Sequence, residues 1–399
     1  MTAAGRRPSW HLVTGEYPPQ PGGVSDYSQL LSQALSNAGE TVHVWAPRTG
    51  SPVDQKAVTF HRVPDFGPRG LRSLSAGLAA VSGPKRLLVQ YVAPAFGYRG
   101  LNVPFVMWLS SREEEVWVQF HEVAYAFAWA QPPLRNVLAV VEWWMAQIVA
   151  EHARRIFISI PGWRRQLGRH ADRAEVLPIP SNLPIDVDPH DARRVRQLLG
   201  LGPLVGHFGT YGSHVADLLA PAIASILRSA QDTRFVFLGR GGLEFAAGFA
   251  SAHPDVASRV VAPGVLDPAP VALHIAACDV LIQPYPDGIS GRRTSAMAAL
   301  ALGKPIVTTT GHLTEAEWAH SGAVVLAPVG DVAALRDAVS MLLASEEKRA
   351  ELGLRARAWY DTFFSIQRTL AILRSSERIE EQQPILPVPI SLSGDWNHS

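Results

Sequence analysis

The sequence predicts an α/β protein made of two doubly wound, parallel-sheet domains of similar size. The chain has 399 residues, which exceeds what one hydrophobic core usually organises. Short β-rich runs alternate with helical patterns in both halves, as expected of repeated β-α-β units. A stretch at 176–189 that contains four prolines separates the halves and is the best linker candidate.

The first half opens with a strand, a glycine turn and a helix. Residues 10–14 are β-rich, the turn at 15–23 ends in two glycines, and apolar side chains from Val24 onward share one helical face. The run from Asn37 to Gly39 is a helix stop signal. Four more strand-like runs follow, separated by segments long enough for helices: 41–45, 86–92, 116–120 and 155–159.

The second half repeats this pattern. Its strands are expected at 204–208, 234–238, 260–261, 279–283, 305–309 and 323–326. A helical pattern then runs from 331 to about 375, and a proline-rich tail at 382–394 is expected to be extended. We place the domain boundary near Ser181, and two such sheets predict a cleft lined by the carboxyl ends of their strands.

Composition excludes several classes of protein. With 36 Lys and Arg against 35 Asp and Glu, the net charge of +1 supplies no general field for nucleic acid. The single cysteine, Cys278, excludes an intramolecular disulfide framework and is expected to be a small buried residue. Neither a signal peptide nor an apolar run of membrane-spanning length is evident, so we expect a soluble, cytoplasmic protein, with peripheral contact at the inner membrane face as the alternative.

The most informative segment runs from 283 to 305, where a strand, a glycine-containing loop and a helix follow one another. The loop carries Asp287 and Ser290, and the first turn of the helix is expected to hold Arg292 and Arg293. Arginines oppose the positive end of the helix dipole, so their position favours an anion such as a diphosphate. The alternative is that both pair with carboxylates across the domain gap.

Other candidate residues follow strands of the predicted sheets. Gly22 and Gly23 precede a helix and allow close approach of a ligand, although an ordinary turn is equally consistent with them. His121 follows the strand at 116–120 directly and is a candidate for contact with a sugar or reacting group. Glu16, Tyr27 and Tyr91 are expected to face the same region as His121. The backbone of Gly264–Val265–Leu266 is a candidate for contact with a nucleobase edge. A structural role is the alternative for each of them.

Several motifs together resemble the family-4 group of retaining glycosyltransferases. They are Gly15-Glu-Tyr-Pro-Pro-Gln-Pro-Gly-Gly-Val, the strand end at His121, Phe237-Leu-Gly-Arg-Gly, Cys278-Asp-Val-Leu-Ile-Gln-Pro-Tyr and Ala299-Leu-Ala-Leu-Gly-Lys-Pro-Ile-Val-Thr. The resemblance covers about residues 10 to 375. It implies a GT-B fold with an acceptor domain at 1–180, a nucleotide-sugar domain at 181–360, and a segment at 361–399 whose helix crosses back to the first domain, a role that 357–366 could fill. It also implies a nucleoside-diphosphate sugar as co-substrate and no metal or other cofactor.

The sequence departs from this family at the donor site. The family carries two glutamates eight residues apart, which fall here on Ser290 and Ala298, or on Asp287 and Ser295 in a second register. The basic residues that neutralise the diphosphate after the first strand of the second domain are replaced by 209–215, so we expect Arg292 and Arg293 to take over that role. The resulting assignment is His121, Arg292 and Arg293 as catalytic residues; Gly22, Gly23, Gly209, Thr210, Tyr211, Gly264, Val265, Leu266, Asp287, Ser290, Gly291 and Thr294 at the donor; and Glu16, Tyr27 and Tyr91 at the acceptor.

Three functions remain open from the sequence, of which the third is a membrane-scaffold or partner-binding protein without enzyme activity. The first is a hexosyltransferase that acts with retention of configuration on a glycan, a glycolipid or a small-molecule acceptor in polysaccharide or glycoconjugate biosynthesis. The second is a pseudo-glycosyltransferase or a non-catalytic sugar-nucleotide-binding protein. Six of the eleven tryptophans lie between 101 and 165, which suits core packing or contact with a lipid-linked acceptor at a membrane surface. No nucleic-acid partner is expected, and the oligomeric state is not predicted.

Overall fold

The computed structural model describes residues 7–47, 58–125, 127–129, 131–200 and 202–375. The chain divides into two compact units, which we call the first and the second domain. The first comprises Met1–Asn182 together with Ile366–Arg374, and the second comprises Leu183–Ser365 together with Ser375–Ser399. The proline-rich tail expected at 382–394 lies outside the described residues.

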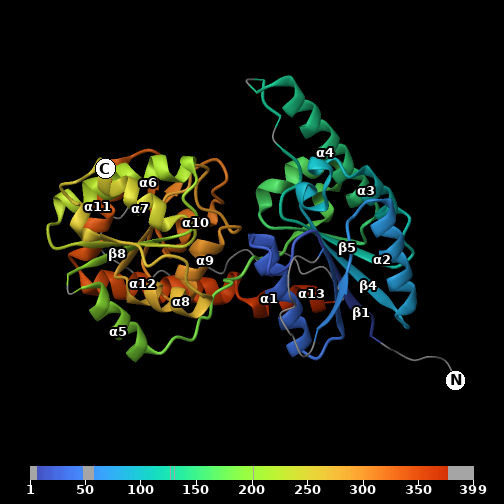
Figure 1. Cartoon of the computed structure of the whole chain (residues 1–399), viewed down its shortest axis with the longest axis horizontal. Helices are drawn as coiled ribbons and strands as arrows, with labels where there is room; N and C mark the ends of the chain where they lie inside the picture. The colour runs from blue at the N-terminus through green and yellow to red at the C-terminus, as the bar shows by residue number, and fades with distance from the viewer. Residues whose placement is uncertain (1–6, 48–57, 126, 130, 201, 376–399) are drawn as a thin grey trace. The chain divides into compact units, whose positions relative to one another are not determined.

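The first domain contains a seven-stranded parallel sheet in the order β3-β2-β1-β4-β5-β6-β7 (Figure 1). Its strands are β1 (Ser9–Thr14), β2 (Val42–Ala46), β3 (Thr59–Arg62), β4 (Lys85–Tyr91), β5 (Glu115–Phe120), β6 (Arg155–Ile158) and β7 (Ala174–Val176). The five strands expected from the sequence are confirmed. The two edge strands, β3 and β7, were not predicted because they are short and lack an apolar run.

Helices cover both faces of this sheet. They are α1 (Gly23–Asn37), α2 (Pro68–Ala80), α3 (Val103–Ser110), α4 (Pro133–His152) and α13 (Ile366–Arg374), with 3-10 segments η1 (Ala93–Phe96), η2 (Tyr98–Gly100) and η3 (Pro161–Arg173). Side chains of α2, α3 and α4 share one core with the sheet. Helices α1 and α13 contact each other, so the end of the described chain packs beside its beginning (Figure 1).

The second domain contains a six-stranded parallel sheet in the order β10-β9-β8-β11-β12-β13. Its strands are β8 (Leu204–Phe208), β9 (Arg234–Leu238), β10 (Val260–Val261), β11 (Val280–Gln283), β12 (Ile306–Thr310) and β13 (Val325–Pro328). All six were expected from the sequence, within two residues at each end. Cys278 is 1% exposed in the core of this domain, and burial raises the pKa of its thiol to about 12, which confirms that it is a buried, inert residue.

The helices of the second domain follow its strands in the doubly wound order. They are α5 (Pro189–Leu199), α6 (Ser213–Ser229), α7 (Gly242–Ala252), η4 (Ala257–Arg259), α8 (Pro268–Ala277), α9 (Thr294–Ala301), α10 (Glu317–Ser321), α11 (Val332–Leu343) and α12 (Glu346–Phe363). The helical pattern expected from 331 to 375 is interrupted. The side chain of Ser345 caps a new helix by accepting a hydrogen bond from the Lys348 N–H, and another break follows Phe363 before α13.

Candidate functional site

The candidate site lies where the strands of the second sheet end. Because all its neighbouring strands are parallel, the loops after β8, β9, β11 and β12 emerge at one edge of the sheet. The loop after β11 is held against its neighbour, since Ile289 donates its N–H to the Thr309 oxygen at 2.8 Å and Leu313 to the Asp287 oxygen at 3.0 Å. Gly288 has a φ of 85°, and a Cβ there would lie 2.3 Å from the Gly311 nitrogen, so this close approach requires glycine.

Asp287 and the two arginines form an ion-paired group on this loop. Arg292 lies 2.6 Å from Asp287 Oδ2, and Arg293 pairs with Asp287 Oδ1. The Arg293 guanidinium also lies over the Tyr285 ring, 4.6 Å from its centroid. With two guanidinium groups and one carboxylate, this three-residue group carries a net charge of +1.

The arginines differ from the sequence expectation in two respects. Helix α9 begins at Thr294, so Arg293 is its N-cap residue and Arg292 precedes it; neither lies in the first turn. Their carboxylate partner is Asp287 of the same loop, rather than a carboxylate across the domain gap. The local ion pairs offset the unfavourable placement of two cations near the positive end of the helix dipole.

Glu315 supports the loop at 284–293, which we call the arginine loop, and it was not predicted from the sequence. Its carboxylate accepts hydrogen bonds from the Gly291 N–H at 2.9 Å and from Trp318 Nε1 at 2.8 Å. Burial raises the pKa of this carboxyl group. The signal available in the sequence was its place, five residues after β12, at the same edge of the sheet as Asp287.

Three buried polar atoms near this loop have no hydrogen-bond partner among the described residues. They are His207 Nε2, Gln283 Oε1 and Ser290 Oγ. The other ends of two of these side chains are fixed, because His207 Nδ1 lies 2.9 Å from the Ile282 oxygen and Gln283 Nε2 donates to the Phe208 oxygen at 3.0 Å. Since buried polar atoms are seldom left unpaired, this group is suited to a polar ligand. Burial lowers the pKa of His207 to about 4, so its imidazole is neutral.

The donor-site residues predicted after β8 and β10 differ in their contacts and in their exposure. A Cβ at Gly209 would lie 3.3 Å from His207 Nε2, so its backbone borders the unpaired atoms, and Thr210 is exposed. The Tyr211 hydroxyl instead donates to the Leu238 oxygen at 3.1 Å, and its ring stacks on Phe245, which gives it a structural contact. In a separate loop Gly264 is half-buried, Val265 is exposed and Leu266 is half-buried.

His121 and Tyr27 meet at the carboxyl edge of the first sheet. Their rings are in edge-on contact with centroids 5.2 Å apart, and His121 Nε2 lies 2.8 Å from Gln90 Oε1. Burial lowers the pKa of His121 to about 3, so the imidazole is neutral. Because Gln90 Oε1 can only accept, Nε2 donates to it and Nδ1 is left as an acceptor, which suits contact with a sugar hydroxyl better than with an anion.

The remaining first-domain candidates lie in different surroundings. A Cβ at Gly22 would lie 2.7 Å from Glu16 Oε2, so this carboxylate sits against the residue that precedes helix α1, while Gly23 has no neighbour within 4 Å of its Cβ position. Burial raises the pKa of Glu16. Tyr91 is 1% exposed, burial raises the pKa of its phenol, and its ring packs in the core against Phe96 and Phe120.

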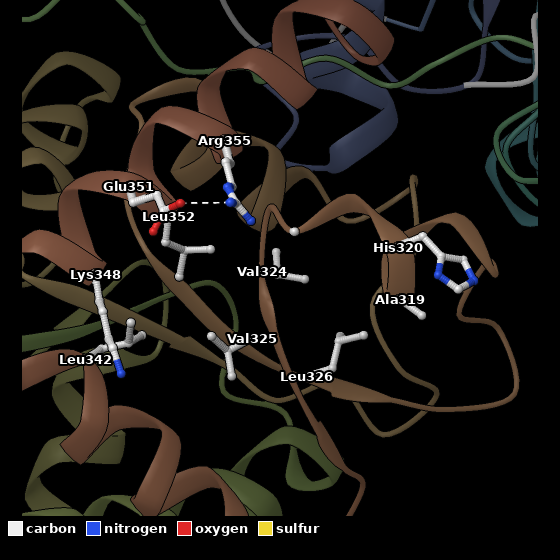
Figure 2. A pocket seen from close by; sticks show the side chains of 11 residues that line it. Ala319, His320, Val324, Val325, Leu326, Leu342, Lys348, Glu351, Leu352 and Arg355 are labelled. Carbon is white, nitrogen blue, oxygen red and sulfur yellow. Dashed lines mark hydrogen bonds and ion pairs between the residues drawn. The ribbon is translucent and has the colours of Figure 1, made fainter. Parts of the chain in front are cut away.

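One cavity of the second domain lies away from the arginine loop. It has a volume of about 290 Å³ and is lined by β13, α11, α12 and the segment at 319–322 (Figure 2). Glu351 and Arg355 pair across 2.7 Å on its wall. Val324 precedes β13, and Val325 and Leu326 begin it, so this cavity lies toward the amino end of that strand. Within the described ranges, no group of three or more His, Cys, Asp or Glu residues is placed to hold a metal ion.

Comparison with known proteins identifies the fold and the second domain. Residues 202–345 match the family model described as glycosyl transferases group 1. No curated protein sequence matches the chain. The matched range begins just before β8 and ends after α11, and it includes the whole arginine loop.

Solved structures of the same fold align over nearly the whole chain. Sucrose-phosphate synthase from Thermosynechococcus elongatus is 18% identical with a TM-score of 0.70, covering 92% of this chain and 97% of that one. HepE of Anabaena, in complex with UDP and glucose, is 15% identical with a TM-score of 0.66, covering 92% and 98%. WaaG, a glycosyltransferase involved in lipopolysaccharide biosynthesis, is 17% identical with a TM-score of 0.65, covering 92% and 100%. The fold is GT-B, and with the matched domain it indicates a glycosyltransferase.

Proposed function

We propose that this GT-B glycosyltransferase moves a hexosyl group from a nucleoside-diphosphate sugar to a glycan, glycolipid or small-molecule acceptor, with retention of configuration and without a metal ion. The observation that carries the proposal is the net positive group of Asp287, Arg292 and Arg293 at the carboxyl edge of the second sheet. The complex of HepE with UDP and glucose supports a nucleotide sugar as donor.

In this proposal the barrier falls because negative charge is stabilised as it develops on the leaving diphosphate. Arg292 and Arg293 supply the charge, and Asp287 fixes the orientation of both guanidinium groups before the donor arrives. Glu315 holds Gly291, the residue before Arg292, and so acts as a positioning residue. The unpaired atoms of His207, Gln283 and Ser290 offer polar partners to the donor.

His121 is assigned to the donor sugar, and Glu16 and Tyr27 to the acceptor side. A neutral imidazole binds hydroxyl groups without attracting a second phosphate, which suits a sugar contact. The Glu16 carboxylate beside Gly22 disfavours an anion at the start of α1, so we assign this turn to a hydroxyl of the sugar or acceptor rather than to the diphosphate.

The test is release of nucleoside diphosphate from a panel of nucleotide sugars with candidate acceptors, in the presence of EDTA. Arg292→Ala and Arg293→Ala should each reduce kcat by about 10²-fold or more, as expected when one stabilising donor is removed. The matched control is Arg228→Ala, an exposed arginine of the same domain that is paired with Asp255, and it should retain activity. Activity that both site variants retain would contradict the assignment.

One observation favours a second candidate, a pseudo-glycosyltransferase or a non-catalytic nucleotide-sugar-binding protein. The positions at which the resembling family carries glutamates hold Ser290 and Ala298, and Ala298 is fully buried in α9. In the other register, Ser295 hydrogen-bonds to the Tyr285 hydroxyl at 2.8 Å. Tight nucleotide binding by the wild-type protein without turnover of any donor would support this second function.

A further inference from the structure

Helix α4 is apolar on two opposite faces, and one of them is exposed. The side chains of Met145 and Val149 are buried against the sheet. On the other side Leu134, Val137 and Val140 are 72%, 58% and 54% exposed. An exposed apolar face of this extent is typical of a site that contacts a partner or a membrane.

Aromatic side chains extend this face. Trp144 is 48% exposed on α4, and Trp129 and Phe127, in the loop before it, are 92% and 53% exposed. We call Phe127, Trp129, Leu134, Val137, Val140 and Trp144 the α4 apolar face. Figure 1 shows that the start of α4 stands out from the rest of the first domain.

The stretch that carries most of this face holds a single charged residue, and that residue is basic. From Val123 to Val141 the sequence holds one charged residue, Arg135, which is exposed. Exposed Arg165 belongs to η3, which packs on α4 next to Trp143.

We propose that the α4 apolar face docks the protein on the surface of a bilayer that contains anionic phospholipid. Tryptophan beside arginine is the combination favoured at the boundary between headgroups and acyl chains. Among the described residues no helix is both long and apolar enough to cross a bilayer, so α4 would lie in the interface.

The test is flotation of the full chain with vesicles, without donor or acceptor, so that its outcome is independent of the proposed function. One set of vesicles is phosphatidylcholine alone, and the other also contains phosphatidylglycerol. The wild-type protein should float with the anionic vesicles and less with the neutral ones. A triple variant, Trp129→Ser, Leu134→Ser and Val137→Ser, should lose binding about tenfold or more, because large exposed apolar groups drive insertion.

A matched triple variant keeps the result interpretable. Leu198, Leu243 and Leu354 are 86%, 54% and 74% exposed on the second domain, and their change to serine should leave flotation unchanged. Arg135→Gln should weaken binding to anionic vesicles about fivefold, as expected for one basic residue near such a surface. Circular dichroism checks that each variant is folded. Wild-type protein that stays in the soluble fraction with both vesicles, or a first triple variant that floats as well as wild type, overturns the proposal.

Discussion

Glu315 connects the loop after β12 to the loop after β11, where it meets Gly291, 24 residues earlier in the sequence. Its carboxylate accepts two hydrogen bonds, from Gly291 and Trp318, and both donors are N–H groups. A carboxylate can satisfy both, whereas an amide presents one acceptor oxygen and one donor group. An ionised carboxylate is therefore suited to this position, because it can accept both hydrogen bonds.

Glu315→Gln should destabilise the second domain by about 1–2 kcal/mol and weaken nucleotide-sugar binding, because one of the two N–H groups would face the amide NH₂. Urea unfolding and a binding titration with the donor measure the two effects. Glu317→Gln is the matched control, since Glu317 is an exposed neighbour on α10. Equal stability and equal donor affinity in the two variants would show that Glu315 does not position the arginine loop.

For single residues, the sequence indicates which side chains follow which strand, but not which side chains contact one another. Arg292, Arg293 and Asp287 were placed on one loop from the sequence, yet their mutual ion pairs depend on a backbone path that local pattern does not determine. For Tyr91, the sequence did not indicate which way the side chain faces. A tyrosine at the end of a strand can face a ligand or the core, and only the packing of Phe96 and Phe120 against its ring decides for the core.

Three neighbouring strands carry an aromatic cluster on one side of the first sheet. The rings of His11 on β1 and His43 on β2 stack with centroids 4.6 Å apart. His43 Nδ1 lies 2.8 Å from His61 Nε2 on β3, and Trp45 Nε1 donates to His11 Nδ1 at 3.0 Å. Burial lowers the pKa of all three histidines. For His11, burial together with repulsion from His43, Lys85 and His61 lowers the pKa to about 3.

The first domain should therefore lose stability in mild acid. Because the folded pKa of His11 is below its unfolded value, its contribution is fully present above about pH 6.5 and is lost as the pH falls toward about 3. The slope should approach about 1 kcal/mol per pH unit for each histidine that takes up a proton. Urea unfolding at several pH values measures it. His11→Gln should flatten the slope, whereas the exposed His190→Gln should not; an unchanged slope in the first variant contradicts this account.

Helices and strands could be predicted where the pattern of their own residues indicates them. The buried parallel strands are continuous apolar runs, so their positions could be read directly from the sequence. Edge strand β3 reads Thr-Phe-His-Arg and depends on pairing with β2 for its conformation. The break after α11 depends on the Ser345 cap, a single side chain within an otherwise helical pattern.

The chain as a whole returns to its first domain at the end of the described residues. Helix α13 packs there, one helix later than the segment 357–366 named from the sequence, most of which belongs to α12 in the second domain. Thr369 donates its hydroxyl to the Pro178 oxygen at 3.1 Å, and Arg155 donates to the Ile372 oxygen at 3.2 Å. The periodicity of α13 indicates a helix with one apolar face but does not indicate which domain buries that face.

Because α13 completes the first domain, a substitution in it should act on that domain and leave the second unaffected. Leu373 is fully buried, so Leu373→Ala should destabilise the first domain by about 2–5 kcal/mol through lost burial and the resulting cavity. Calorimetry of the full chain should show one transition shifted to lower temperature, with the transition that nucleotide stabilises unchanged. Gln367→Ala, at an exposed position of the same helix, should change neither transition. A shift confined to the nucleotide-stabilised transition would mean that α13 supports the second domain instead.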